Sequence, residues 1–587
     1  MGNSSTSTDQ NPAILPGETA PTELPYPKMA KKDEPAAVRK KLALLKLDSQ
    51  DLDDREIVNT PVFAEAVRRN VDVGAFQDEP IFSQYGLLGG EVSRLHELRR
   101  SNATPPPEDA PFIHYNVSAP SSTFICGSQG SGKSHTLSCL LENCLLASDA
   151  NTLPNPLTGI VFHYDPFASD ANGQPCEAAH LSSNPDVSVR VLCAPTNVKQ
   201  IKCSYVKATY GHLKNVKVQE LRLSQSDLNT KRMLDLMAVS SLQGGGMPLY
   251  FHVVTRILKE MRIKQQQTGG HFDYGSFKRA LATEGLTEGQ LGPLGQRLET
   301  LESFMAQEHV AQGFWLSKKS SRKRNAFSVE AFEDTATAWE GKAGQLTIVD
   351  LSCPCVTAES ACALFNICLN LFLEQNTMTG RVVALDEAHK YMTESPESQT
   401  LTESLLATIR LQRHLGARMV IATQEPTISP KLLDLCSVTI VHRFTSPDWL
   451  ESLKKHLAAA RPGLILPPDR DEVAGCHGPD PLTGLFAKIV SLRQGEALLF
   501  CPSALVGVDK SEPAENGNGN GNGNGGVKID GFAGWAKSQK DAAGSEERRG
   551  IIVDSFGNSL VRLGCGVMHI RVRERVTEDG GKSVMAE

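Results

Sequence analysis

A glycine-rich stretch at residues 127 to 134 has the residue types and spacing to hold a chain of phosphates. It reads Gly-Ser-Gln-Gly-Ser-Gly-Lys-Ser and matches G-x-x-x-x-G-K-[ST] at every defined position. Glycines let such a loop curl so that backbone N–H groups point inward, and a following helix N-terminus adds positive charge. We expect Lys133 to reach the β- and γ-phosphates of ATP and Ser134 to bind Mg²⁺. The predicted nucleotide-binding residues are Gly127, Ser128, Gln129, Gly130, Ser131, Gly132, Lys133, Ser134 and His135.

The sequence around this stretch places it between a strand and a helix. Residues 123–126 are mostly apolar and predict a short buried strand. After the loop, apolar residues recur at helical spacing: Leu137, Leu140, Leu141, Cys144 and Leu145. This context favours a phosphate site over the alternative, a Gly/Ser loop that only turns the chain.

Two adjacent carboxylates follow another apolar run. Residues 381–385 predict a buried strand, and Asp386 and Glu387 come directly after it. At the carboxyl edge of a parallel sheet, Asp386 would face the Mg²⁺ held by Ser134, and Glu387 could polarise the attacking water. The alternative is an ordinary strand exit. Together with a complete phosphate loop, the pair predicts hydrolysis of the nucleotide.

A glutamine and two arginines complete the candidate site. Gln424 follows the predicted strand 419–423, where it could sense the γ-phosphate or orient water; otherwise it is a loop residue. Residues 400–403 match a helix capping box, and the helix expected after them carries Arg410 and Arg413 on one side. Either arginine could reach the phosphates of a neighbouring subunit. A solvated helix face is the alternative.

These segments, in this order, resemble the HerA/FtsK superfamily of ring-forming, DNA-pumping P-loop ATPases. The resemblance covers roughly residues 112–506 and implies an additional strand between the two Walker strands. It also implies that Glu387 activates water, that Gln424 senses the γ-phosphate, and that Arg413 or Arg443 acts between subunits. The sequence departs from the family at Glu425, where an arginine is common, and in having no run of short strands near the N-terminus. The segments that carry the resemblance are residues 127–134, 347–352, 385–389, 422–426, 441–444 and 492–497.

The alternation of strands and helices predicts an α/β fold, a RecA-like P-loop NTPase with a mainly parallel sheet and helices on both faces. Residues 227–307 are helical in pattern instead and predict a helical insertion. Further strands are expected at 159–164, 187–193, 216–221, 346–351, 382–385 and 437–443.

Composition divides the chain into four parts. We predict a largely disordered N-terminal region with short helices at 1–111 and an ATPase domain at 112–506. A Gly/Asn-rich linker at 507–530 and a small C-terminal segment at 531–587 follow. No task is evident for the last segment.

The overall composition is that of an intracellular globular protein. The chain has 587 residues, a net charge of −7 and no apolar run long enough to span a membrane, which predicts a cytoplasmic or nuclear location. The acidic balance means that any contact with DNA must be local. The 14 cysteines include no C-x-x-C pair, so we interpret them as buried thiols rather than zinc ligands.

Two further motifs lie at the N-terminus and in a basic stretch of the chain. Residues 1–6 match the acceptor for N-myristoylation, which would make Gly2 a weak membrane tether; a disordered N-terminus is the alternative. Residues 318–324 carry five positive charges and could be a nuclear localisation signal, a nucleic-acid contact or a solvated loop.

Two functions from different classes are consistent with the sequence. The first is an oligomeric ATPase motor that acts on DNA or another polymer. The second is a nucleotide-gated adaptor with slow or no hydrolysis, which the acidic net charge and Glu425 favour.

Overall fold

The structure is a computed structural model. It describes residues 38–39, 49–74, 80–168, 174–208, 215–236, 249–305, 337–375, 378–426, 428–456, 481–509, 551–553 and 559–579. The chain forms two compact units, residues 1–52 and 53–587, and the second contains the sheet and the candidate site. Gly2, the basic stretch 318–324 and the Gly/Asn-rich repeat lie outside the described residues.

Eight parallel strands form the main part of the sheet, in the spatial order β8-β7-β9-β6-β10-β11-β4-β12. The strand that precedes the glycine loop, β4, is therefore separated from β10, which precedes the acidic pair, by β11. This confirms the additional strand that the sequence resemblance implied. The strands are β4 (Ser122–Cys126), β6 (Thr158–His163), β7 (Ser188–Cys193), β8 (Val216–Glu220), β9 (Gln345–Asp350), β10 (Arg381–Leu385), β11 (Ala417–Thr423) and β12 (Val438–Val441).

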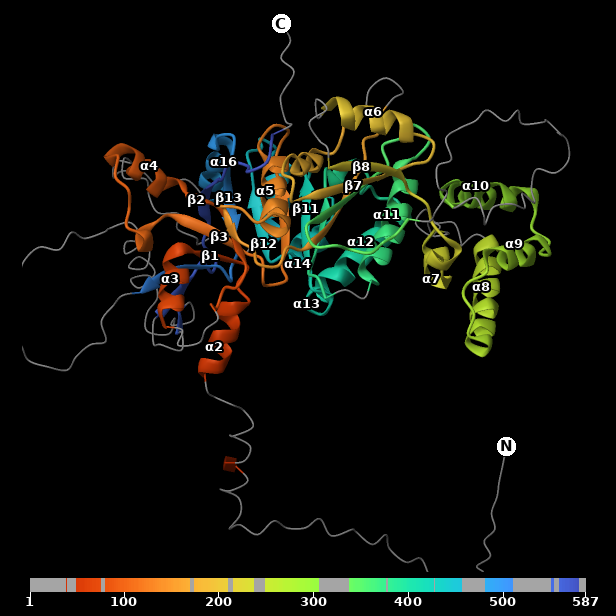
Figure 1. Cartoon of the computed structure of the whole chain (residues 1–587), viewed down its shortest axis with the longest axis horizontal. Coiled ribbons are helices and arrows are strands. Elements are labelled where there is room, and N and C mark those ends of the chain that lie inside the picture. Colours follow the sequence, from red (N-terminus) through yellow and green to blue (C-terminus); the bar gives the residue numbers. More distant parts are fainter. Residues whose placement is uncertain are drawn as a thin grey trace, which may run out of the picture. The chain divides into compact units, whose positions relative to one another are not determined.

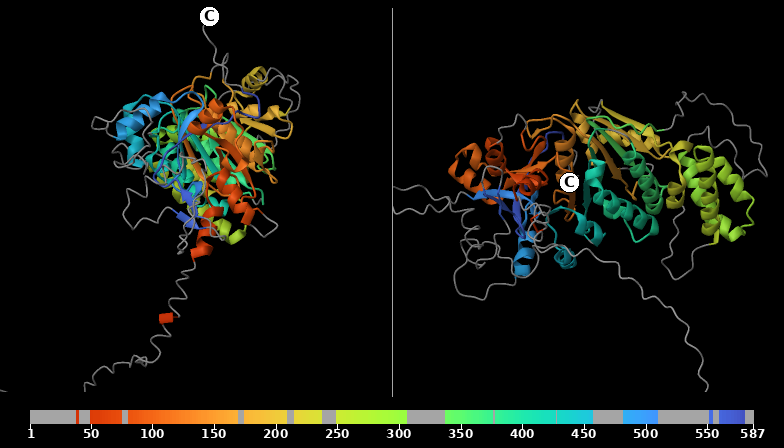
Figure 2. Two further views of the ribbon diagram at one scale, coloured as in Figure 1. Left: turned by 90° about the vertical axis from the view of Figure 1, so that its left-hand side faces the viewer. Right: turned by 90° about the horizontal axis from the view of Figure 1, so that it is seen from below.

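Antiparallel strands extend the sheet beyond β12, in the order β13-β17-β2-β3-β1. Figures 1 and 2 show the orange strands of the N-terminal part beside the blue strands of the C-terminal part. The sequence shows no run of short strands near the N-terminus, but two strands of this sheet, β1 and β2, precede residue 112. The remaining strands of the sheet are β1 (Val62–Ala64), β2 (Tyr85–Glu91), β3 (Phe112–Asn116), β5 (Asn151–Thr152), β13 (Glu496–Phe500), β14 (Leu505–Asp509), β15 (Ile551–Val553), β16 (Ser559–Arg562) and β17 (Met568–Val572).

Helices cover both faces of the sheet, as the sequence predicted. Alternate residues of the parallel strands enter two separate apolar clusters, because successive side chains of a strand point to opposite faces. One cluster includes α5 and α6, and the other includes α11, α12 and α14 to α16. The helices are α2 (Ser49–Val58), α3 (Glu65–Gly74), α4 (Val92–Ser101), α5 (Lys133–Leu145), α6 (Val198–Ala208), α11 (Ala358–Leu373), α12 (Pro396–Arg410), α13 (Gln412–Leu415), α14 (Pro430–Leu435), α15 (Pro447–His456) and α16 (Pro481–Ser491).

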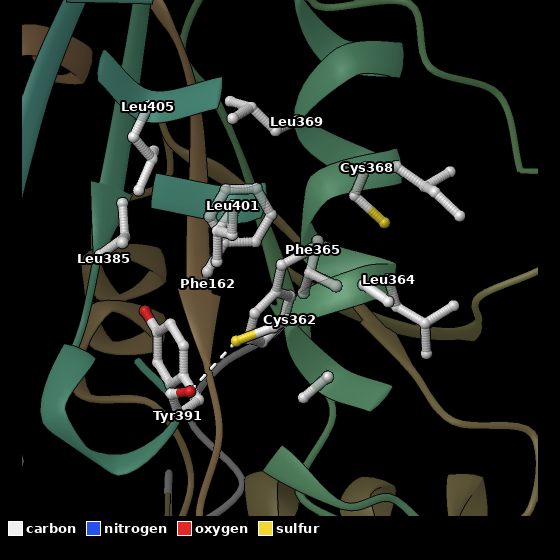
Figure 3. Packing of buried hydrophobic residues seen from close by; sticks show 14 of the residues in the cluster. Phe162, Cys362, Leu364, Phe365, Cys368, Leu369, Leu385, Tyr391, Leu401 and Leu405 are labelled. Atoms are coloured by element: carbon white, nitrogen blue, oxygen red, sulfur yellow. Dashed lines mark hydrogen bonds between the residues drawn. The ribbon is translucent and has the colours of Figure 1, made fainter. Parts of the chain in front are cut away.

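Aromatic packing fixes α11 and the segment after β10 against the sheet. Phe162 of β6 lies 4.9 Å from Phe365 of α11 between ring centroids, and Phe365 lies 5.0 Å from Tyr391. Figure 3 shows these rings together with Leu401 of α12, and Cys362 Sγ donates to the Tyr391 carbonyl at 3.1 Å. The chain that leaves β10 is thus held in place directly beside the acidic pair.

The described residues of the predicted helical insertion form four helices. Figure 1 shows α8, α9 and α10 as one group of helices beyond α7. Their apolar faces join the same cluster as α11, so this region is an extension of that core. The helices are α7 (Thr230–Leu236), α8 (Leu249–Thr268), α9 (Tyr274–Ala282) and α10 (Glu288–Phe304).

The capping box expected at residues 400–403 is wrong. Helix α12 begins one turn earlier at Pro396, and the Ser395 side chain accepts a hydrogen bond from the Ser398 N–H at 3.2 Å. Proline fits the first helical position because an N–H there would have no partner within the helix, and proline has no N–H. The helix ends at Arg410, so Arg413 lies on the separate short helix α13 and not on the same helix.

The predicted domain limits of 112 and 506 stay predictions. The pairing of β13 with β17, and of β17 with β2, joins residues from both sides of these limits to the same sheet. None of the helices in the described ranges has both the length and the apolar character of a membrane span.

Candidate nucleotide-binding site

The glycine loop connects β4 to the first turn of α5. Gly127, Gly130 and Gly132 all have positive φ angles, of 153°, 72° and 113°. The Ser128 N–H and hydroxyl both donate to the Arg443 carbonyl, at 2.9 and 2.8 Å. The Lys133 Nζ donates to the Ser128 carbonyl at 3.1 Å. The lysine side chain therefore folds back over the loop, where phosphates would lie in the predicted site.

A buried histidine, His442, supports the glycine loop. His442 follows β12, and its ring nitrogens hydrogen-bond to Thr136 Oγ1 at 2.9 Å and to the Glu496 carbonyl at 3.0 Å. Burial lowers the pKa of His442 to about 4, so the ring is neutral at neutral pH. It therefore links α5, β12 and β13 without placing a second positive charge beside Lys133.

The same histidine leaves no room for a side chain at Gly127. A Cβ there would lie 2.7 Å from His442 Cβ, whereas a Cβ at Gly130 would meet no atom within 4 Å. We expect Gly127→Ala to displace the loop and to weaken ATP binding by tenfold or more, since it adds a clash to backbone strain of about 1 kcal/mol. Gly130→Ala is the matched control because it carries the strain alone. Titration with a fluorescent ATP analogue measures both, and equal affinities would contradict this account.

The acidic pair and the glutamine lie together at the carboxyl edge of the sheet. Strands β10 and β11 are neighbours, so the residues that follow them meet at one edge. The Gln424 side-chain amide donates to Glu387 Oε2 at 3.3 Å. Gln424 and Glu387 are half-buried, and Asp386 is buried. The structure thus brings together these three predicted site residues.

Electrostatic interactions connect this edge with the glycine loop. Burial raises the pKa of Glu387, the neighbouring Asp386 raises it further, and Lys133 opposes the shift. Burial lowers the pKa of Lys133, while Glu387 and Asp386 hold it up. The charges of Lys133 and the two carboxylates therefore influence one another's pKa, as expected of residues that share one site. A carboxylate with a raised pKa is also a better proton acceptor.

Glu387 has an unusual backbone conformation that the sequence did not reveal. Its φ of 47° and ψ of 47° lie in the left-handed region, which non-glycine residues seldom occupy. Such strain persists only where the surrounding packing maintains it, and it is concentrated at functional sites. His389 Nδ1 lies 3.3 Å from Glu387 Oε2, but burial lowers the pKa of His389 to about 4. At neutral pH this contact is therefore not an ion pair.

Asp386 has different partners for its two carboxylate oxygens. Its Oδ2 lies 3.2 Å from His163 Nδ1 and 3.7 Å from Cys176 Sγ. Its Oδ1 is buried and has no hydrogen-bond partner among the described residues. Burial raises the pKa of Asp386, but the hydrogen bond and charge of His163 outweigh it, so the pKa is lowered. Neither His163 nor Cys176 was predicted as a site residue. The only sequence signal for His163 is its position near the end of the predicted strand 159–164.

The two candidate arginines of α12 and α13 are exposed. Arg410 ends α12, and Arg413 lies on α13. Neither is placed against the glycine loop by any contact within the described part of the chain. The Arg443 side chain is also exposed, and its carbonyl supports the loop through Ser128. Action between subunits stays a prediction for all three.

The C-terminal segment holds the helix that follows the glycine loop, a role that the sequence did not indicate. His135 Nε2 hydrogen-bonds to the Arg573 carbonyl at 2.8 Å, so the predicted nucleotide contact of His135 would have to come from its main chain. Arg573 Nη1 lies 2.7 Å from Glu142 Oε2 on α5. Thr577 donates to Glu142 from both its N–H and its hydroxyl. The alternating arginines at 571, 573 and 575 are the only sequence signal.

The strand order and the loop geometry define a RecA-like P-loop NTPase fold, as the sequence predicted. No family model matches the chain, and a search of curated protein sequences finds no match. Among solved structures, it is similar to VirB4 of Thermoanaerobacter pseudethanolicus, with 12% identity over 71% of this chain and 93% of that chain and a TM-score of 0.37.

Two further solved structures show the same kind of likeness. The bacterial conjugative coupling protein TrwB has 12% identity over 74% of this chain and 96% of its own, with a TM-score of 0.35. The genome packaging NTPase B204 from Sulfolobus turreted icosahedral virus 2 has 14% identity over 28% of this chain and 67% of its own, with a TM-score of 0.20. These likenesses, at 12% to 14% identity, concern the fold alone. At these TM-scores, the fold assignment rests on the strand order.

Proposed function

We propose that this chain binds ATP at residues 127 to 135 and hydrolyses it. The observation that carries the proposal is the order of the parallel strands. Strand β4, which precedes the glycine loop, and β10, which precedes Asp386 and Glu387, lie on either side of β11, so both segments leave the sheet at the same edge. A loop that only turned the chain would need no acidic pair beside its lysine. The main-chain N–H groups of the loop would hold the phosphates, and Lys133 would neutralise part of their charge.

The residues around the acidic pair fit the handling of the attacking water. Glu387 is half-buried and its pKa is raised, so it can accept a proton from a water molecule near the γ-phosphate. Gln424 donates to Glu387 and would orient the carboxylate and the water together. Hydrolysis then depends on positioning and on charge neutralisation, with little covalent chemistry for the protein to perform.

The residues present also fit Mg²⁺. Asp386 Oδ1 is buried without a partner among the described residues, which leaves a carboxylate oxygen available for a hard cation. Ser134, in the first turn of α5, would supply its hydroxyl. When bound, Mg²⁺ neutralises charge on the β- and γ-phosphates.

The oligomeric state and the substrate acted on are further parts of the proposal. Exposed Arg410 and Arg413 are available to reach a neighbouring subunit, which supports a homo-oligomeric ring. DNA is the polymer proposed from the sequence resemblance. An adaptor with slow turnover is the second candidate, favoured by Glu425, which is exposed directly after Gln424. Salt-sensitive DNA binding that stimulates turnover supports the first, since phosphate contacts release counterions.

Phosphate release by the full chain tests the proposal. We expect turnover of ATP that requires Mg²⁺ and that is lost in Lys133→Ala, because the variant has no positive charge over the loop. Lys431→Ala is the control, since Lys431 is an exposed lysine on α14. A wild-type chain that binds no ATP, or a Lys133→Ala variant with unchanged turnover, would overturn the proposal.

A further inference from the structure

Three potential metal ligands meet in a buried cluster next to the proposed nucleotide site. His163, Cys176 and Asp386 each present one ligand atom, and these atoms lie within 4.8 Å of one another. His163 and Asp386 are about 5% exposed or less, and Cys176 is fully buried. We propose that this cluster is a binding site for Zn²⁺.

The positions of the three residues follow from the sheet. His163 ends β6, Asp386 follows the neighbouring strand β10, and the Asp386 N–H donates to the Phe162 carbonyl at 3.0 Å. Cys176 precedes the short helix η2 (Glu177–Ser183), and its N–H donates to the Tyr205 hydroxyl at 3.1 Å. All three ligands are thus held by main-chain contacts or regular structure, as a preformed site requires.

The distances between ligand atoms agree with tetrahedral zinc. Typical Zn–N, Zn–O and Zn–S bond lengths place a nitrogen and an oxygen ligand about 3.4 Å apart and an oxygen and a sulfur about 3.6 Å apart. The observed distances from Asp386 Oδ2 are 3.2 Å to His163 Nδ1 and 3.7 Å to Cys176 Sγ. Both distances from Asp386 therefore fit one shared cation, and all three ligand atoms lie within 4.8 Å of one another.

The second contact of the histidine supports the same role. His163 Nε2 lies 3.3 Å from the Gln174 carbonyl, which can accept its proton, so Nδ1 can exchange its hydrogen bond with Asp386 for a metal. Metal-binding histidines commonly donate their other ring N–H in this way. The thiolate and carboxylate together balance the two charges of zinc, so the loaded site adds no net charge to the buried region. A nitrogen, sulfur and oxygen donor set favours Zn²⁺ over Mg²⁺ or Ca²⁺.

The site shares Asp386 with the proposed magnesium site. Zinc bound to Oδ2 withdraws charge from the carboxylate whose Oδ1 would serve Mg²⁺, so we expect zinc to inhibit ATP turnover. This consequence rests on the proposed function, whereas the zinc site itself does not.

Cobalt is the probe for the site, because Co²⁺ substitutes for zinc and a thiolate ligand gives it an intense near-ultraviolet absorption. We expect the full-length wild-type chain to gain one thiolate-bound Co²⁺ that zinc displaces. Cys176→Ser and His163→Gln should lose this equivalent, and Cys203→Ser should retain it because Cys203 is an exposed thiol of α6. A wild type without the absorption, or a Cys176→Ser variant that retains it, would overturn the zinc site. The wild-type measurement decides this even if a variant fails to fold.

Phosphate release under zinc tests the shared carboxylate. We expect saturating Zn²⁺ at fixed Mg²⁺ to remove most turnover from the wild type, and a smaller fraction from Cys176→Ser when each protein is compared with itself. A wild type that binds cobalt through a thiolate and keeps full turnover under zinc would overturn the inhibition. Absence of turnover without any zinc would overturn the proposed function and leave the cobalt result standing.

Discussion

Glu387→Gln is expected to keep ATP binding and to lower the turnover number by about 10²- to 10⁴-fold, the range that a general base contributes. Glutamine has nearly the same shape, and its side-chain oxygen can still accept the hydrogen bond that Gln424 donates at 3.3 Å. Only the proton-accepting carboxylate is lost. Binding is measured by calorimetry with ATP, and turnover by phosphate release.

Glu425 provides a matched control for this variant. Glu425→Gln makes the same chemical change at an exposed position directly after Gln424. We expect its turnover to stay within about twofold of the wild type, the scale of a surface substitution. If Glu387→Gln behaved like Glu425→Gln, Glu387 would have no role in activating water. If it lost ATP binding as well, the effect would lie in the structure of the site.

The parallel half of the fold was predictable because its residues interact mainly with regular neighbours. Apolar runs such as 159–164 and 382–385 predict strands that are covered on both faces, and β6 and β10 occupy nearly these residues. The glycine loop was predictable because its chemistry requires a fixed spacing within eight residues. Local patterns of this kind need no information from distant parts of the chain.

The partners from distant parts of the chain were not predictable from local patterns. Cys176 meets Asp386 across 210 residues, and His442 meets Thr136 across 306. A single cysteine or histidine carries no periodicity that would identify its partner. The capping box failed for a related reason: residues 400–403 fit the pattern, but Ser395 and Pro396 offered a better helix start one turn earlier.

Glu142→Gln is expected to lower the free energy of unfolding by about 3 kcal/mol at neutral pH, because it breaks a buried ion pair by removing one partner. Glu142 is fully buried on α5, and the side chains of Arg573 and Arg575 are 6% and 2% exposed. Without the carboxylate, Arg573 would keep a buried positive charge next to a neutral amide. Urea denaturation, followed by tryptophan fluorescence and circular dichroism, measures the loss.

The pH dependence of this loss has a definite sign. Burial raises the pKa of Glu142, but hydrogen bonds from Thr577 and the charge of Arg573 outweigh it, so the pKa lies below its ordinary value of 4.5. A carboxylate with a lowered pKa in the folded state stabilises fully above its unfolded pKa, and the stabilisation disappears as pH falls through the folded value. The difference between wild type and Glu142→Gln should therefore shrink from pH 7 toward acid. Glu574→Gln, at an exposed position beside Arg573, should show little difference at any pH. A Glu142→Gln difference that grew toward acid would contradict a charged Glu142 in the folded chain, and the C-terminal segment would then be held to α5 by its neutral hydrogen bonds alone.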